Sequence, residues 1–172
     1  EIYERELKAL LTGDPRTVAK MVKTCSPSET EAYNRMRTNP FMVVRAAGSL
    51  GVDLVALRWD FSFPIEVKSS AEEVMHFSKN PRLGEQADKM RSECATAHVL
   101  PMYAFRLKNY RGDPWRVFRV PSDDTLKGKA GILMRRVPPF HRTDNGNYVM
   151  RWDEGMKLSD LLAYMDMSEY SE

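Results

Sequence analysis

Two short apolar runs with a more polar break between them form the clearest pattern along the chain. Residues 51–58 and 63–70 are rich in β-branched and apolar side chains, and residues 59–62 separate them. This arrangement predicts an antiparallel β-hairpin. A turn centred between Asp60 and Phe61 would pair residues whose numbers sum to 121.

One face of the predicted hairpin carries charged side chains. Glu66 and Lys68 are two positions apart in the second run, so they share a face of that strand. In the register above, Asp53 lies opposite Lys68 and diagonally from Glu66, roughly 7–8 Å away between backbones. A solvated polar face is the ordinary explanation for such a pattern. Here the flanking residues are strongly apolar, which predicts a partly buried cluster in which unpaired charge is costly.

A hard divalent cation would relieve that cost. Mg²⁺ is typically held by one or two carboxylates together with water and phosphate oxygens, so Asp53 and Glu66 are candidate ligands, with Mn²⁺ as an alternative ion. The metal would polarise a phosphate and lower the pKa of a bound water. Lys68 would orient that water or neutralise charge developing on the phosphate. The predicted chemistry is phosphodiester hydrolysis, in the D…E-x-K pattern of restriction-endonuclease-like nucleases.

The rest of the chain predicts helices and further strands around this hairpin. We expect residues 69–83 to be an irregular basic loop near the site, in which Lys79 and Arg82 contact a nucleic-acid backbone; an exposed loop without a ligand is the alternative. The fold class is therefore α/β, a single domain of residues 1–172 with a mixed central β-sheet flanked by α-helices. The predicted helices are 1–11, two capped helices within 14–37, 86–98 and 158–165; the further strands are 41–45, 100–107, 115–120, 131–137 and 148–152.

Composition narrows the partners and excludes several kinds of site. The net charge is only +2, so a nucleic-acid surface must come from segregated charge. Two cysteines are too few for a disulfide framework or a cysteine zinc site, and the three histidines share no metal-ligand spacing. We find no membrane-span or secretory pattern, and expect an intracellular protein, cytoplasmic and nucleoid-associated, from a cell or a virus.

Three blocks of the sequence resemble archaeal-type Holliday junction resolvases, which belong to the restriction-endonuclease-like nuclease superfamily. The first is the opening helix, residues 3–11. The second and most specific is 43–56, Val-Val-Arg-Ala-Ala-Gly-Ser-Leu-Gly-Val-Asp-Leu-Val-Ala, and the third is 65–70, Ile-Glu-Val-Lys-Ser-Ser. The resemblance covers most of the chain outside 12–40, where two capped helices replace a short turn. We expect the domain to fold without residues 14–37.

The resemblance assigns roles that the residue pattern alone leaves open. It implies that Glu4, and not Glu6, is the helix carboxylate that completes the catalytic and metal site. Ser49 would be the serine of the active-site loop, where a plain turn residue is the alternative. Arg5 and Arg45 match basic residues that contact the DNA backbone.

The function that follows is a Mg²⁺-dependent, structure-selective endonuclease. It would resolve four-way (Holliday) junctions in DNA recombination and repair by paired symmetric nicks, and the resemblance implies a homodimer. One alternative is a nuclease of the same fold that acts on other branched or duplex DNA. Another is a catalytically silent DNA-binding scaffold.

Overall fold

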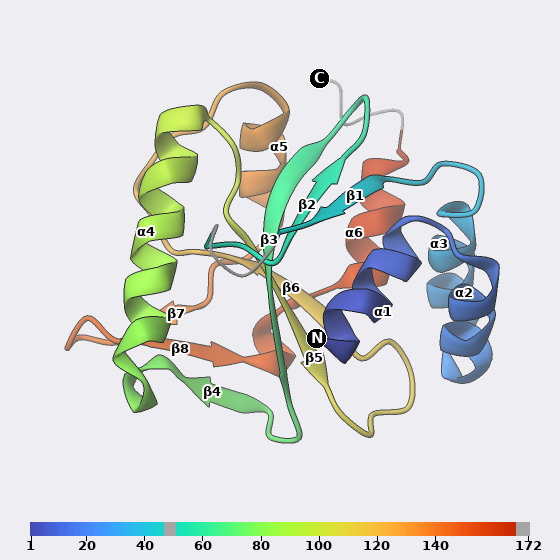
Figure 1. The fold of residues 1–172 in the computed structure, drawn as a ribbon, viewed down its shortest axis with the longest axis horizontal. Coiled ribbons are helices and arrows are strands. Elements are labelled where there is room, and N and C mark those ends of the chain that lie inside the picture. The colour runs from blue at the N-terminus through green and yellow to red at the C-terminus, as the bar shows by residue number, and fades with distance from the viewer. Residues whose placement is uncertain (47–50, 168–172) are drawn as a thin grey trace.

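The fold is built on a mixed six-stranded sheet of order β1-β2-β3-β5-β6-β9 (Figure 1). The computed structural model describes residues 1–46 and 51–167. Neighbouring strands are antiparallel, except that β3 and β5 are parallel. A smaller sheet has the order β4-β8-β7. The strands are β1 Met42–Arg45, β2 Leu54–Leu57, β3 Ser62–Ser70, β4 Val74–His76, β5 Met102–Leu107, β6 Trp115–Arg119, β7 His141–Arg142, β8 Tyr148–Arg151 and β9 Met156–Lys157.

Helices cover both faces of the main sheet. In Figure 1, α4 and the small sheet lie on one side, and α1, α2, α3 and α6 lie on the other. This arrangement confirms the predicted α/β class with a mixed central sheet. No helix in the described ranges is long and apolar enough to cross a membrane. The helices are α1 Ile2–Leu11, α2 Pro15–Met21, α3 Pro27–Arg35, α4 Pro81–Ala97, α5 Gly128–Arg136 and α6 Leu158–Met165, with short 3₁₀ turns at Val22–Thr24, Phe77–Lys79 and Trp152–Glu154.

The central strand β5 separates two apolar cores. Met102 and Ala104 point into the core that contains α1 and α6. Tyr103, Phe105 and Leu107 point the other way, into the core formed with α4 and β8. Successive side chains of a strand alternate between faces, so a strand buried on both sides is apolar throughout. The charged face of β3 lies on the α4 side of this division.

The two helices of the 12–40 segment begin at the predicted caps, Asp14 and Ser26. They are part of the core, because Tyr33 is fully buried and α3 packs against α6. The hydroxyl of Tyr33 donates a 2.6 Å hydrogen bond to the buried carboxylate of Asp113. This packing argues against the expectation that the domain folds without residues 14–37.

The strand predicted at 131–137 is wrong, because this segment lies in helix α5, Gly128–Arg136. Its short apolar run is ambiguous between strand and helix in the sequence. In the structure Leu133 and Val137, four residues apart, are both buried against the core, which is the spacing of one helix face. The strand β8 is present as predicted, but its partners are β4 and β7.

The prediction of an irregular loop at 69–83 is also wrong. Strand β3 continues to Ser70, and β4 then pairs antiparallel with β8. Helix α4 begins at Pro81, with the side chain of Asn80 accepting a hydrogen bond from the backbone N–H of Arg82. The pairing of β4 depends on a strand far along the chain, so the local sequence carries little signal for it.

The hairpin of β2 and β3 has a different register from the predicted one. Leu54 pairs with Ile65, so paired numbers sum to 119 instead of 121. The turn is closed by a 3.1 Å hydrogen bond from the backbone N–H of Arg58 to the carbonyl of Phe61. The guanidinium of Arg58 also holds the buried carboxylate of Asp60, with a shortest N–O distance of 2.7 Å. These contacts move the centre of the turn one residue towards the N-terminus.

Candidate active site

The structure bonds Asp53 to the two residues that flank Glu66 on β3. The backbone N–H of Asp53, immediately before β2, donates to the carbonyl of Ile65 at 3.2 Å. The carboxylate of Asp53 accepts a 2.7 Å hydrogen bond from the backbone N–H of Val67. The carboxyl group of Asp53 also helps to raise the pKa of Glu66. Asp53 and Glu66 therefore form a neighbouring pair of acids at the site.

Glu66 is the most strongly perturbed acid of the site. Its side chain is almost completely buried, at 2% exposed, and its Oε2 atom has no hydrogen-bond partner within residues 1–46 and 51–167. Burial, followed by the hydrogen bond with Asp53, raises the pKa of Glu66 to about 9, and the negative charges of Asp53 and Glu4 add to this. The positive charge of Lys68 opposes the shift. Glu66 is therefore neutral at pH 7 in the absence of a bound cation.

The pair has the donor chemistry of a magnesium site with few protein ligands. Over the described ranges, no group of three or more His, Cys, Asp or Glu side chains is arranged to hold a metal. Mg²⁺ needs only one or two carboxylates when water and phosphate supply the remaining oxygens. A buried carboxylate oxygen without a partner calls for an explanation, and a cation would satisfy it. Asp53 and Glu66 therefore fit Mg²⁺ or Mn²⁺.

The two acids of helix α1 have different environments. Glu4 accepts a 3.1 Å hydrogen bond from Arg45, and its charge reaches Glu66, whose pKa it helps to raise. Glu6 instead pairs with Arg106 at 2.7 Å. Of the two, Glu4 lies towards the carboxylate pair, while Glu6 joins α1 to β5.

Lys68 contacts a residue that sequence reasoning missed. Its ammonium donates to the side-chain oxygen of Gln86 on α4, at 3.4 Å. In the sequence Gln86 was only the expected start of a helix, and no motif singled it out. Arg82 lies one turn earlier on the same face of α4 and is exposed, and Lys79 is exposed in the preceding 3₁₀ turn. These basic residues thus lie near the part of α4 that contacts Lys68.

The other predicted DNA-contacting residues lie at the start of the fold. Arg5 is exposed on α1 and pairs with Glu1 at 3.8 Å. Arg45 ends β1 and is 32% exposed, with its guanidinium directed at Glu4. Ser49 lies outside the described residues.

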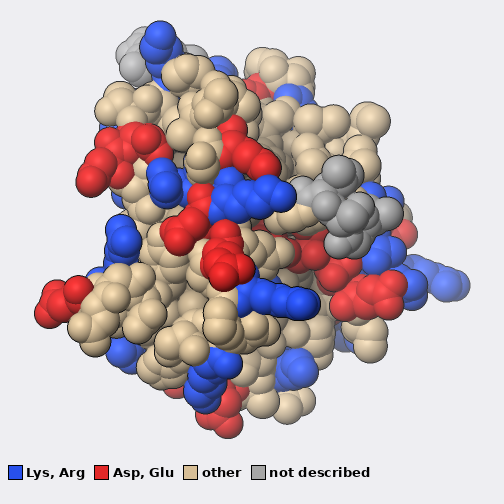
Figure 2. Space-filling model, turned by 60° about the vertical axis from the view of Figure 1, so that its left-hand side comes forward, with Lys and Arg blue, Asp and Glu red and all other residues tan. Residues whose placement is uncertain are grey.

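Surface charge is mixed over the face that Figure 2 turns towards the viewer. Lysine and arginine side chains alternate with aspartate and glutamate side chains, and no single basic surface covers this face. This pattern agrees with the net charge of +2. Any contact with a polyanion must therefore use local groups of basic residues.

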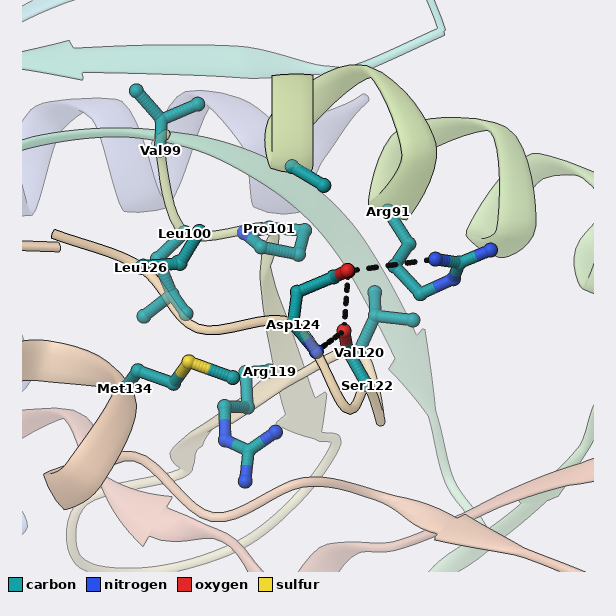
Figure 3. Close-up of a pocket in the computed structure, with 11 residues that line it drawn as sticks. Arg91, Val99, Leu100, Pro101, Arg119, Val120, Ser122, Asp124, Leu126 and Met134 are labelled. Carbon is teal, nitrogen blue, oxygen red and sulfur yellow. Dashed lines mark hydrogen bonds and ion pairs between the residues drawn. The ribbon is translucent and has the colours of Figure 1, made fainter. Parts of the chain in front are cut away.

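A small pocket between α4, α5 and the loop after β6 is separate from the carboxylate pair (Figure 3). Its volume is about 10 Å³, enough for about one water molecule. At its polar end, the carboxylate of Asp124 accepts a hydrogen bond from the hydroxyl of Ser122, and the backbone N–H of Asp124 donates one to that hydroxyl. The same carboxylate pairs with Arg91 at 3.5 Å. Its lining includes none of the predicted catalytic residues, and its size excludes a nucleotide.

Comparison with known proteins adds evidence on the fold. No protein-family model and no curated protein matches the sequence. Among solved structures, the chain is similar to Hjc, a Holliday junction resolvase from the archaeal hyperthermophile Archaeoglobus fulgidus. The TM-score is 0.50 at 16% sequence identity, and the match covers 84% of this chain and 96% of that chain. The chain has the fold of this resolvase.

The similarity to this resolvase confirms the predicted α/β fold class with a mixed central sheet. At 16% identity the similarity concerns the backbone, so it does not by itself assign chemistry to side chains. The chemical argument therefore rests on the residues that the resolvase fold brings together here, namely Asp53, Glu66 and Lys68, with Glu4 nearby.

Proposed function

We propose that this chain is a divalent-cation-dependent endonuclease that resolves four-way DNA junctions by paired symmetric nicks. The observation that carries the proposal is the pairing of half-buried Asp53 with buried Glu66 on a resolvase fold. Within the described residues, one oxygen of Glu66 has no hydrogen-bond partner, and the pKa of Glu66 is raised. Burying such a group costs free energy, and a bound cation would offset that cost by stabilising the ionised carboxylate.

Each residue of the site would have a defined task. When bound, Mg²⁺ would supply Lewis acidity towards the phosphate and a lowered pKa for a coordinated water. Asp53 is held by the N–H of Val67, which orients its carboxylate. Lys68 is steadied by Gln86, and its ammonium would neutralise charge that develops on the phosphate or orient the attacking water.

The proposed substrate is recognised by shape and backbone charge. Exposed Arg82 and Lys79 precede the part of α4 that contacts Lys68, and Arg5 lies on α1 beside Glu4 in sequence. Such residues would bind phosphates without reading base sequence. A homodimer would supply two active sites related by a two-fold axis, which matches the symmetry of a four-way junction.

The test is a cleavage assay with a labelled four-way junction and a matched linear duplex, each with Mg²⁺ and with EDTA. We expect paired, symmetric nicks in the junction only when Mg²⁺ is present. Asp53→Asn should abolish cleavage while retaining junction binding in a gel-shift assay. Asp144→Asn, at an exposed acid in the β7–β8 turn, is the matched control and should cut normally. Light scattering of the purified protein should give the mass of a dimer.

Three results would contradict parts of the proposal. Equal cutting of junction and duplex would support nuclease activity but contradict selectivity for junctions. Junction binding without cutting in Mg²⁺ or Mn²⁺ would favour a DNA-binding scaffold. Full cleavage activity of Asp53→Asn would contradict the assignment of Asp53 as a metal ligand.

A further inference from the structure

The side chain of Tyr103 is buried next to the carboxylate pair without an assigned task. Tyr103 on β5 is the parallel-strand partner of Glu66 on β3, and both side chains lie on the α4 face of the sheet. The residue is completely buried, and its hydroxyl has no hydrogen-bond partner within the described ranges. Buried tyrosine hydroxyls usually have one, so this position needs an explanation.

The ring of Tyr103 is fixed by other aromatic residues. Phe140 contacts it edge-on, with a centroid distance of 5.2 Å, and Phe77 lies at 6.0 Å. The hydroxyl therefore cannot swing out to solvent without disrupting this core. Besides burial, the strongest influences on its pKa are the negative charges of Glu66 and then Asp53, and both raise it. Tyr103 is thus a permanently protonated donor close to these two acids.

The hydrogen-bonding needs of Tyr103 and Glu66 are complementary. Within the described residues, neither the hydroxyl of Tyr103 nor Oε2 of Glu66 has a hydrogen-bond partner. Once Glu66 is ionised, its oxygens can only accept hydrogen bonds, and the hydroxyl of Tyr103 can donate one. Asp53 differs, because the N–H of Val67 already orients its carboxylate. The site therefore has a fixed donor for Asp53. Tyr103, the ladder partner of Glu66, is a buried donor on the same face, and the two side chains do not bond each other in this structure.

We propose that Tyr103 is a positioning residue for the cation site. Its O–H would donate to one oxygen of Glu66 when that carboxylate binds a divalent cation, which leaves the other oxygen to face the ion. This inference rests on the proposed function, since it needs a cation at Asp53 and Glu66. Donors of this kind fix the orientation of a ligand, and their loss typically weakens metal binding by about 10–100-fold.

The test is calorimetric titration of the metal-free protein with Mn²⁺, without DNA. We expect Tyr103→Phe to raise the Kd for Mn²⁺ by roughly 10–100-fold. The same substitution should not lower the Tm measured in EDTA, because it removes only a hydroxyl that has no partner among residues 1–46 and 51–167. A residue that served packing alone would leave the Kd unchanged.

Tyr148→Phe is the matched control. Tyr148 is buried in the same aromatic cluster, but its hydroxyl donates to Asp88. This variant should lower the Tm and leave the Kd for Mn²⁺ unchanged. An equal Kd for wild type and Tyr103→Phe, or an equal weakening in both variants, would overturn the role of Tyr103. Absence of Mn²⁺ binding by the wild type would instead overturn the proposed metal site itself.

Discussion

At the scale of single residues, burial gives Glu66 its unusual chemistry. A carboxyl group that is 2% exposed and lies beside a second carboxyl group cannot ionise as it does in water. The free energy involved is about 1.4 kcal/mol for each unit of pKa shift. The folded protein therefore keeps a proton on Glu66 at neutral pH, and a cation would have to displace it.

This protonation predicts how stability depends on pH in EDTA. The folded state keeps the Glu66 proton up to about pH 9, whereas the unfolded state releases it near the ordinary glutamate pKa of 4.5. The unfolded state therefore binds fewer protons in this window, and stability falls as pH rises through it, with a slope approaching about 1.4 kcal/mol per pH unit. Glu66→Gln should remove this contribution, which urea unfolding at pH 6, 7 and 8 would measure.

The contribution of Glu66 is the difference between the wild type and Glu66→Gln in the slope of unfolding free energy against pH. Burial also raises the pKa of Asp113, so the wild-type slope contains more than one group. Glu72→Gln, at an exposed position after β3, is the control and should keep the wild-type slope. An unchanged slope in Glu66→Gln would show that Glu66 is ionised in the folded protein.

The two acids of α1 predict opposite consequences of the same substitution. Glu4→Gln should lower the cleavage rate by roughly 10–100-fold, the range for groups that support metal ligands. Glu6→Gln should mainly destabilise the fold, by about 1–3 kcal/mol, because Glu6 accepts hydrogen bonds from Arg106 and from the indole N–H of Trp115. Cleavage rates and urea unfolding of both variants would show which acid belongs to the active site. A larger loss of cleavage in Glu6→Gln than in Glu4→Gln would assign that role to Glu6.

At the scale of elements, β3 organises the site. It carries Glu66 and Lys68, its hairpin partner places Asp53, and its parallel partner places Tyr103. β3 lies beside β5, the strand that separates the two cores, so Glu66 is buried while Lys68 and Asp53 are half-buried. Loops are easier to displace than central strands, which suits this location for groups that must keep a fixed geometry.

The helices of the 12–40 segment are predicted to be essential for folding. Replacing residues 14–37 by a short turn would uncover the core under α6 and remove the hydrogen bond from Tyr33 to Asp113, so we expect no cooperative unfolding transition. The milder Tyr33→Phe should cost about 1.5–3 kcal/mol, the range for hydrogen bonds to charged groups. Glu31→Ala, on the exposed side of α3, should change stability by less than about 0.5 kcal/mol. A deletion variant that still folds would show that residues 14–37 are a dispensable insertion.

At the scale of the whole molecule, the charge distribution limits how DNA can be held. With a net charge of +2 and mixed signs on the surface, attraction must come from local basic groups, such as those at the start of α4. Each phosphate contact releases counterions and makes binding weaker at higher salt.

Arg82→Ala tests this view of DNA binding. It should weaken junction binding and reduce the slope of log affinity against log salt by about 1, without changing which strands are cut. The measurement is junction binding in EDTA over a series of salt concentrations. Arg35→Ala, on α3, is a basic control whose loss should leave the slope unchanged. An unaltered slope in Arg82→Ala would show that the start of α4 does not contact DNA.

Local features of the sequence determined several helix boundaries and the face on which the charged strand residues lie. The caps Asp14 and Ser26, the stripe of α1 and the alternation of Glu66 and Lys68 depend on neighbours within a few residues, so they were predicted correctly. The fold class followed from these elements and from the resemblance in blocks 43–56 and 65–70, which the similarity to Hjc confirms.

Tertiary structure alone decided the contacts between distant segments. The hairpin register depends on how Arg58 and Asp60 bond within the turn. This register places Asp53, just before β2, where it bonds Ile65 and Val67 on either side of Glu66 instead of pairing with Lys68. The contact of Gln86 with Lys68 and the place of Tyr103 beside Glu66 exist only after helix α4 and strand β5 pack on β3. A local pattern predicts which face a side chain occupies, but packing between elements decides which side chains meet there.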